Sequence, residues 1–285
     1  MRKKISARKL KAGFAETARF MALAVFMVFA VLPLLWIIIT SLKPTTEIYT
    51  FPLKYFPSKI TFAGYDRLLK FANFGHYFIN SLWVSLAAAA GGLAASVLAG
   101  FALSRLRARQ KIRGLLLALY FTQMVPSFIL MAPLFFTLSK LHLTNNRLVL
   151  AVVYAATTVA FGAIMAKSFF DHIPASIEEA ALIDGCDPLN ALFRIILPIS
   201  LPGLVAIFSF AFVNVWNELF LAVMLMSTDK KMTVPVALNS FISKAGVNWD
   251  VMSAGIVMAL IPTMVIFAIG QKYIVAGLTE GGVKG

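Results

Sequence analysis

The sequence predicts an all-α membrane protein that crosses the bilayer six times. Of its 285 residues, 60% are hydrophobic and only 13% are charged, and the mean hydropathy is +0.85. A water-soluble domain typically carries about 25% charged residues, so this chain has too little charge to cover a surface that faces water. It also contains six mainly apolar stretches close to the length of about 20 residues that a bilayer-spanning helix needs. The expected fold class is therefore a polytopic helical membrane protein.

The six expected spans divide the chain into a transmembrane domain at 20–271, a basic N-terminal segment at 1–19 and a C-terminal tail at 272–285. The first apolar stretch follows basic residues, as in a signal peptide, but it is too long and lacks a small-x-small cleavage site before Lys43-Pro44. We therefore expect it to be retained as a helix. The expected spans are Phe20–Thr40, Ser81–Ser104, Gly114–Leu138, Leu148–Ala166, Leu201–Met226 and Met252–Gln271.

The positions of the basic residues predict the direction of these spans. Residues 1–19 contain seven Lys and Arg residues, and the short segment 105–113 contains five more. Cytoplasmic loops of membrane proteins are enriched in Lys and Arg, so both segments are expected in the cytoplasm. The two segments are separated by two expected spans, which makes the assignments consistent with each other. Both chain ends, and the segment 167–200 between the fourth and fifth spans, are then cytoplasmic as well.

Several other functions find no support in the composition. A net charge of +14 would indicate a nucleic-acid partner in a soluble protein, but here the basic residues lie beside the spans. The single cysteine, Cys186, excludes an internal disulfide. The histidines, His76, His142 and His172, lie far apart and form no pair with metal-ligand spacing. We therefore expect no metal site, no catalytic site and no nucleic-acid partner.

Small residues and prolines within the spans indicate helix packing. Gly92, Ser96 and Gly100 recur at four-residue spacing in the second span, as do Gly91, Ala95 and Ala99. Small residues at this spacing let two helix backbones approach closely in a membrane; the alternative is a helix that is merely rich in Ala and Gly. Proline removes a backbone hydrogen bond and favours kinks. The prolines within the expected spans are Pro126, Pro133 and Pro262.

The cytoplasmic segment 167–200 carries the most informative pattern. Ser176 and Glu179 have the spacing of a capping box, and Gly185 is suited to the left-handed residue that closes a helix. Together they predict a short helix over Ile177–Asp184, with a second helix starting at Pro188. Ile177, Ala180, Ala181 and Asp184 share one face of that helix, so the middle of this face is small and flat. Such a face suits docking into a groove on a partner; the alternative is an ordinary turn between two spans.

The same segment resembles the EAA signature of ATP-binding-cassette importer permeases. The matching residues are Glu179-Ala180-Ala181, then Gly185 after three residues, Ile195 after nine more, and Leu197-Pro198. The family usually has alanine after the glycine, where this chain has Cys186, which is also small. Further motifs resemble the carbohydrate branch of the family and its MalG-type subunit. They are Ser41-Leu42-Lys43-Pro44, Asn80-Ser81, Met124-Val125-Pro126, Pro133-Leu134, Trp216-Asn217-Glu218 and the Gly-rich tail 275–285.

This resemblance implies a type I ABC importer permease in the bacterial inner membrane. In that family the cytoplasmic helix is a coupling helix that docks on an ATPase subunit, and the C-terminal tail approaches the ATPase dimer interface. The implied partners are a MalF-type permease, two cytosolic ATPases that use ATP and Mg²⁺, an extracytoplasmic solute-binding protein and membrane lipid. The chain itself has no G-x-x-x-x-G-K-[ST] loop for ATP, so we expect no bound cofactor and no enzymatic activity. The implied coupling residues are Ser176, Glu178, Glu179, Ala180, Ala181, Asp184, Gly185, Leu197 and Pro198.

Polar residues within the spans are candidates for the substrate pathway, because each is costly in lipid unless it faces protein or a cavity. Asn214, Asn217 and Glu218 lie on one face of the fifth span, and Gln123 lies near the middle of the third. They could offer hydrogen bonds to sugar hydroxyls, or instead tie helices together at the interface with the partner permease. Glu218 could also pair with a basic residue of a partner or remain protonated. Trp216 points away from Asn214 and is expected to pack against lipid or another helix.

The expected function is uptake of a sugar or sugar-like solute. Its binding protein is expected to dock on the outer loops, chiefly 41–80 and 227–251. Two alternatives remain at the level of the sequence. An ion-coupled secondary transporter should show intramembrane charges and internal repeats, but Glu218 is the one clear intramembrane charge and no repeat is evident. A membrane-embedded enzyme should show clustered catalytic groups near the spans, and none is evident.

Overall fold

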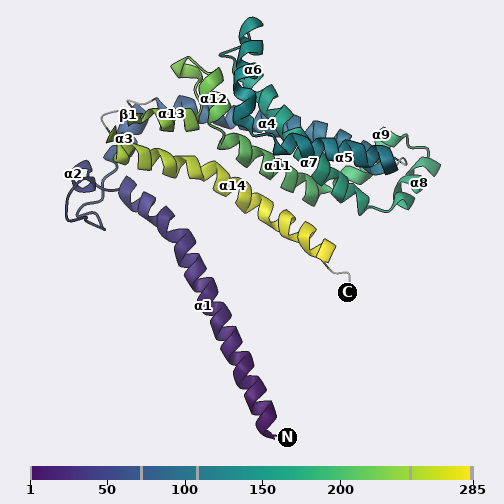
Figure 1. Ribbon diagram of the computed structural model, residues 1–285, viewed down its shortest axis with the longest axis horizontal. Helices are drawn as coiled ribbons and strands as arrows, with labels where there is room; N and C mark the ends of the chain where they lie inside the picture. The colour runs from purple at the N-terminus through teal and green to yellow at the C-terminus, as the bar shows by residue number, and fades with distance from the viewer. Residues whose placement is uncertain (1, 71–72, 107–108, 244–245, 283–285) are drawn as a thin grey trace. The chain divides into compact units, whose positions relative to one another are not determined.

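The computed structural model describes residues 2–70, 73–106, 109–243 and 246–282, and it is almost entirely helical (Figure 1). The chain forms two compact units, Met1–Ala72 with Phe241–Met258, and Asn73–Ser240 with Ala259–Gly285. Within the described residues, four helices are long and apolar enough to cross a membrane. Two bent helix pairs raise the number to six if each pair is one span. The all-α, polytopic prediction is therefore confirmed, with six as the upper number of spans.

The first unit consists of one long helix and a small folded segment. Helix α1 (Arg2–Ser41) contains the candidate span Glu16–Ser41. It is followed by α2 (Thr45–Ile48) and α3 (Ala63–Lys70). The unit also contains the two-stranded hairpin of β1 (Ile242–Ser243) and β2 (Gly246–Val247), and the first turns of α14 (Trp249–Gly282).

A buried carboxylate holds the small folded segment together. Asp250, in the first turn of α14, is 2% exposed. It accepts a hydrogen bond from the Thr45 hydroxyl at 3.1 Å and forms an ion pair with Arg67. A buried charge is stable only when it is paired and hydrogen-bonded. These contacts therefore fix α2 and α3 against the start of α14.

The second unit is built around three helices, α4 (Phe74–Arg105), α7 (Arg147–Asp171) and α11 (Leu201–Trp216). Both α4 and α11 pack against α7 and against each other (Figure 1). The small-residue prediction is confirmed for one of its two registers. A Cβ added at Gly100 would lie 2.6 Å from the Ala166 Cβ on α7, and a Cβ added at Gly92 would lie closer still to the Thr158 hydroxyl. Gly91 and Ala95 are instead exposed, so α4 approaches α7 with its Gly92–Ser96–Gly100 face.

The expected third span is not one continuous helix. It is divided into α5 (Arg109–Met124) and α6 (Ser127–Lys140), which meet at 89°. Pro126 occupies the N-cap of α6 with extended backbone, and the residue before a proline avoids helical geometry. The kink expected at Pro126 is therefore a full break. Pro133 and Pro262 lie inside α6 and α14 without ending them.

The expected fifth span is also interrupted. Helix α11 ends at Trp216, and α12 (Phe220–Leu225) begins after three residues outside these helices. The remaining elements of this part are the 3₁₀ turn η2 (Asp229–Lys231) and α13 (Val234–Ser240), which packs on α4. Four short elements precede α11 in the sequence. They are α8 (Ala175–Ile183), α9 (Pro188–Ala191), the π-helical turn η1 (Leu192–Ile196) and α10 (Leu197–Ile199).

The helices extend beyond several of the apolar stretches that the sequence marks. Helix α4 starts at Phe74 rather than near Ser81, and α14 continues through most of the expected tail to Gly282. Residues 283–285 of the tail and Arg107 of the basic 105–113 segment lie outside the described residues. The tail's expected contact with the ATPases stays a prediction.

Candidate functional site

The segment between α7 and α11 contains the expected short helix, but it starts earlier than the sequence indicates. Helix α8 runs over Ala175–Ile183, and Pro174 occupies its N-cap without a side-chain hydrogen bond. The prediction that Ser176 and Glu179 form a capping box is therefore wrong. Pro174 needs no backbone N–H partner and suits a helix start, so the helix begins directly after it. Ser176 then lies within the first turn instead of capping it.

The end of α8 is formed as expected. Gly185 has φ +87°, in the left-handed region. The Cys186 N–H donates to the Ala181 carbonyl at 2.9 Å, and the Gly185 N–H donates to Leu182 at 3.1 Å. These two bonds define a Schellman motif, which satisfies carbonyls at the end of a helix. Pro188 starts α9 as predicted, and the Asp187 side chain caps it by accepting from the Asn190 N–H at 2.6 Å.

The expected flat face of α8 is divided between the interior and the surface. Ala181 is 4% exposed and Ile177 is half-buried against the core of this unit, so both face inward. Ala180 and Asp184 are exposed, as are Ser176 and Glu179. The prediction that Ile177, Ala180, Ala181 and Asp184 form one docking face is therefore wrong. A helix lying on the body of its own protein must bury one stripe, and this helix buries Ile177 and Ala181.

The segment from α8 to η1 exposes several large apolar side chains. Ile183 is 86% exposed, and the apolar side chains beside it in the chain are largely exposed as well. By the span bounds and the orientation that the sequence predicts, this surface is expected in the cytoplasm. Exposed apolar patches of this kind typically mark interaction sites. We define the coupling patch as Leu182, Ile183, Leu189 and Phe193, with Glu179 and Ala180 beside it.

A buried cluster fixes this segment to the helix bundle. Leu192 and Ile196 of η1 are fully buried and pack with Phe170 of α7, Val97 of α4 and Ile207 of α11. Burying a Leu or Ile side chain contributes roughly 1.5–3 kcal/mol. The last of the expected coupling residues lie just after this cluster, where Leu197 is half-buried and Pro198 is exposed. The segment is therefore packed against three helices of the bundle.

An ion pair links α8 directly to the end of α4. The Arg105 guanidinium binds the Glu178 carboxylate and also donates to the Phe170 carbonyl at 3.1 Å. Both side chains are largely buried, with 22% of Arg105 and 17% of Glu178 exposed. Glu178 therefore faces the body of the protein rather than a partner. Sequence reasoning assigned Arg105 only to the basic loop; its link to Glu178 depends on tertiary contacts that no local pattern reveals.

A second candidate site lies where α11 and α12 are interrupted. A pocket of ≈ 350 Å³ is lined by three of the four expected pathway residues, Asn214, Asn217 and Glu218. Non-helical backbone at membrane depth is tolerated only where it is buried in protein or lines a cavity. The interruption at 217–219 fits this rule. The other lining residues are Ser127, Val213, Leu219 and Phe220.

The expected pathway residues differ in their exposure and in their side-chain hydrogen bonds. Asn214 and Asn217 are exposed, and each donates one hydrogen bond to a carbonyl four residues earlier, at 2.9 and 2.8 Å. Each keeps further hydrogen-bonding capacity on its amide group. Gln123 is exposed on α5 and does not line the pocket. Ser127, at the start of α6, is a lining residue that sequence reasoning missed.

Glu218 has a structural role within the interruption. Its carboxylate accepts from the Tyr154 hydroxyl of α7 at 2.5 Å and from the Leu221 N–H at 3.1 Å. It also accepts a longer bond from the Ala222 N–H at 3.4 Å. A carboxylate at a helix N-terminus satisfies free N–H groups and interacts favourably with the helix dipole. Glu218 therefore caps α12 and ties it to α7.

Trp216 packs against another helix, which was one of its two expected positions. It is 2% exposed, and its indole N–H donates to the Ala259 carbonyl of α14 at 3.0 Å. Its ring stacks on Phe212 and meets Phe78 edge-on. The side chain therefore stabilises the end of α11 beside the pocket.

Comparison with known proteins agrees with this architecture. Residues 91–280 match the family described as "Binding-protein-dependent transport system inner membrane component". The sulfoquinovosyl glycerol transport system permease protein of Agrobacterium fabrum is 35% identical over 268 residues, covering 94% of this chain and 93% of the relative. The trehalose transport system permease protein of Mycobacterium tuberculosis is 34% identical over 259 residues, covering 90% and 93%.

A solved structure shows the same fold. It is that of a bacterial ABC transporter involved in the import of the acidic polysaccharide alginate, with a TM-score of 0.77 at 26% identity. The match covers 90% of this chain and 95% of the other. The chain therefore belongs to the family of binding-protein-dependent transport system inner membrane components. It is a multi-pass permease of the bacterial inner membrane with the type I ABC importer fold, and it is not itself catalytic.

Proposed function

We propose that this chain forms half of a heterodimeric pore, together with a MalF-type permease, that imports a sugar or sugar-like solute. Two of its named relatives are permeases for sulfoquinovosyl glycerol and for trehalose, and the similar structure belongs to an alginate importer. These names support a carbohydrate class without selecting one member. Membership of this family also argues against the alternative function, that of an ion-coupled secondary transporter.

The observation that carries the proposal is the coupling patch and its attachment to the bundle. Ile183 and Phe193 are exposed on the expected cytoplasmic side, where a separate ATPase subunit can cover them. The inner face of α8 is joined to α4 by the Arg105–Glu178 ion pair. In this proposal, two cytosolic ATPases bind ATP and Mg²⁺, close on each other and carry α8 with them. The ion pair and the Leu192–Ile196 cluster pass that movement to α4, α7 and α11.

The solute pathway in this proposal runs past the pocket beside the α11–α12 interruption. Asn214 and Asn217 offer amide groups that can bond to sugar hydroxyls, while Ser127 approaches from α6. Glu218 holds the interruption in place. An extracytoplasmic binding protein delivers the solute to the outer loops, chiefly 41–80 and 227–251.

One experiment tests the proposal as a whole. The chain is co-expressed with the permease, ATPase and binding protein encoded beside it, and the complex is reconstituted in liposomes. ATP hydrolysis should rise when solute-loaded binding protein is added, and labelled solute should accumulate only with ATP. Uptake that continues without ATP and stops when an ion gradient is collapsed would contradict the proposal.

A further inference from the structure

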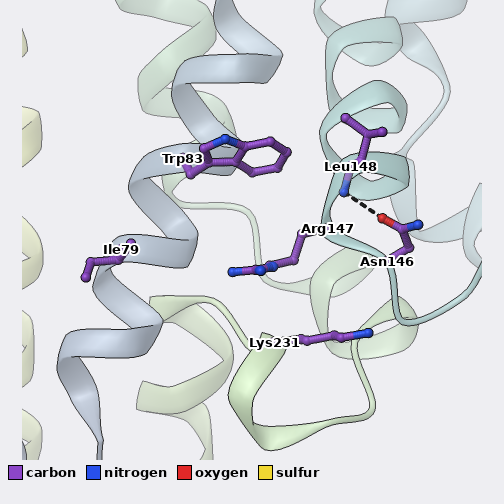
Figure 2. Close-up of a pocket in the computed structure, with 6 residues that line it drawn as sticks. All are labelled: Ile79, Trp83, Asn146, Arg147, Leu148 and Lys231. Carbon is purple, nitrogen blue, oxygen red and sulfur yellow. Dashed lines mark hydrogen bonds between the residues drawn. The ribbon is translucent and has the colours of Figure 1, made fainter.

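A second pocket in the Asn73–Ser240 unit shares no lining residue with the pocket beside the α11–α12 interruption, and two of its residues, Ile79 and Lys231, belong to the outer segments 41–80 and 227–251. It has a volume of ≈ 440 Å³ and lies between the first turns of α4, the start of α7 and η2. Figure 2 shows Arg147 extended towards α4 below Trp83, with Lys231 on its other side. By the predicted orientation, this end of both helices faces the extracytoplasmic side. The lining residues are Ile79, Trp83, Asn146, Arg147, Leu148 and Lys231.

A buried amide holds one of the two cations and the backbone that carries the other. Asn80 is 3% exposed, and its Oδ1 accepts a hydrogen bond from the Arg147 guanidinium. Its Nδ2 donates to the Lys230 and Met232 carbonyls, both at 2.9 Å, which fixes the backbone on either side of Lys231. Lys231 also donates to the Asn145 carbonyl at 2.7 Å. Asn80 therefore positions the Arg147 guanidinium directly and the backbone of Lys231, while the Asn145 carbonyl positions the Lys231 ammonium.

The pocket has positive charge and no acidic lining residue. Neither Arg147 nor Lys231 forms an ion pair within the part of the chain that the structure describes. The nearby carboxylate of Asp229 accepts from the Tyr77 hydroxyl at 2.6 Å and does not line the pocket. The 25-residue helix α7 starts at Arg147, and the positive end of its dipole adds to the field. The site is therefore electrostatically suited to an anion.

The apolar half of the pocket selects one kind of anion. Ile79, Trp83 and Leu148 are 65%, 44% and 60% exposed. They lie at the end of the apolar parts of α4 and α7, where tryptophan is typical of the membrane–water interface. A free anion would gain nothing from these side chains, whereas an acyl chain would cover them. We propose that this pocket binds a phospholipid of the outer leaflet, with its phosphate on Arg147 and Lys231 and its acyl chains along Ile79, Trp83 and Leu148.

The proposal is tested on the purified, delipidated transporter complex by native mass spectrometry with added phosphatidylglycerol. We expect the wild-type complex to retain phosphatidylglycerol in preference to zwitterionic phosphatidylcholine. Lys231→Gln should weaken phosphatidylglycerol binding roughly fivefold, and Arg147→Gln together with Lys231→Gln about twenty-five-fold, from the attraction of each cation to an anionic lipid. The matched control is Lys230→Gln, because Lys230 is the neighbour of Lys231 and does not line the pocket; it should bind like the wild type.

Two further measurements keep the test decisive. Trp83→Ala leaves both cations in place, so it should weaken lipid binding while the affinity for inorganic phosphate stays the same. This variant remains informative if the Arg147 substitution disturbs folding through Asn80. Equal lipid binding by the Lys230 and Lys231 variants would overturn the proposal. So would equal retention of the two lipids, or complete displacement of the lipid by an equal concentration of inorganic phosphate.

Discussion

At the scale of single residues, Gly185 is the position where local backbone geometry matters most. A Cβ added there would meet no atom within 4 Å, so the cost of a substitution comes from its φ of +87° alone. A left-handed conformation costs an ordinary L-residue about 1–2 kcal/mol, and a β-branched residue is strained further. We expect Gly185→Val to abolish solute uptake while the protein still inserts in the membrane, measured by transport assay and immunoblot of membranes.

The matched control at this position is Gly185→Asn, because asparagine adopts left-handed geometry more readily than other residues with a side chain. It should retain most of the uptake. If asparagine were as damaging as valine, the role of the glycine would be steric contact with a partner rather than closure of α8.

The residues of the intramembrane pocket should separate into two groups. Glu218 accepts from Tyr154 and from two backbone N–H groups, and hydrogen bonds to a charged group contribute about 1.5–3 kcal/mol each. Glu218→Gln should therefore lower the thermal unfolding temperature of the complex. Asn214→Ala should leave that temperature unchanged and instead raise the solute concentration needed for half-maximal uptake. The assignment would be contradicted if Asn214→Ala lowered the unfolding temperature and Glu218→Gln only raised the solute concentration needed for uptake. Asn214 would then have the structural role, and Glu218 would contact the solute.

At the scale of elements, the Arg105–Glu178 ion pair is the direct link between α8 and α4. Because the pair is largely buried, loss of either partner would leave the other as an unpaired, poorly solvated charge. Arg105→Glu alone should reduce the stimulation of ATP hydrolysis by loaded binding protein at least tenfold. Arg105→Glu combined with Glu178→Arg should restore much of it. The readout is the ratio of stimulated to basal ATPase activity.

A surface pair provides the comparison for this prediction. Lys70 and Asp66 also form an ion pair, but their side chains are 66% and 54% exposed, and such pairs contribute about 0–1 kcal/mol. Lys70→Gln should leave coupling unchanged. Failure of the charge exchange to restore any stimulation would mean that Arg105 acts through Phe170 and not through Glu178.

At the scale of the whole molecule, the exposed coupling patch predicts a dependence on partners. Ile183 and Phe193 are large, apolar and exposed outside the expected spans, so the isolated chain should associate or be degraded when the ATPase is missing. Ile183→Ser should weaken co-purification of the ATPase with the permease, measured as the amount retained on an affinity tag. Leu117→Ser is a suitable control, because Leu117 is 68% exposed on α5 within a candidate span and outside the patch. Undiminished ATPase retention by the Ile183 variant would place the interface elsewhere.

Hydropathy was enough to predict the class of fold, and local motifs were enough to locate the short helix between the fourth and fifth expected spans. Hydropathy and length mark spans because a bilayer requires about 20 apolar residues per crossing, and the positive φ of Gly185 follows from a local preference of glycine. Small residues at four-residue spacing also predicted the close approach of α4 to another helix, but the structure was needed to show that the Gly92–Ser96–Gly100 face makes it. The start of α8 was predicted wrongly from the capping-box spacing of Ser176 and Glu179. The helix starts two residues earlier, because Pro174 occupies the N-cap position.

The pairing of polar residues, in contrast, could not be predicted from the sequence. Arg105 meets Glu178 across 73 positions of the chain, and Tyr154 meets Glu218 across 64. No local pattern specifies such pairs, because they depend on how α4, α7 and α11 pack. The same packing turned Ile177 and Ala181 inward and left Ile183 exposed, which reassigned the docking face of α8. The sequence thus located the helix that we propose couples this permease to an ATPase, and helix packing decided which of its side chains face the bundle and which are exposed.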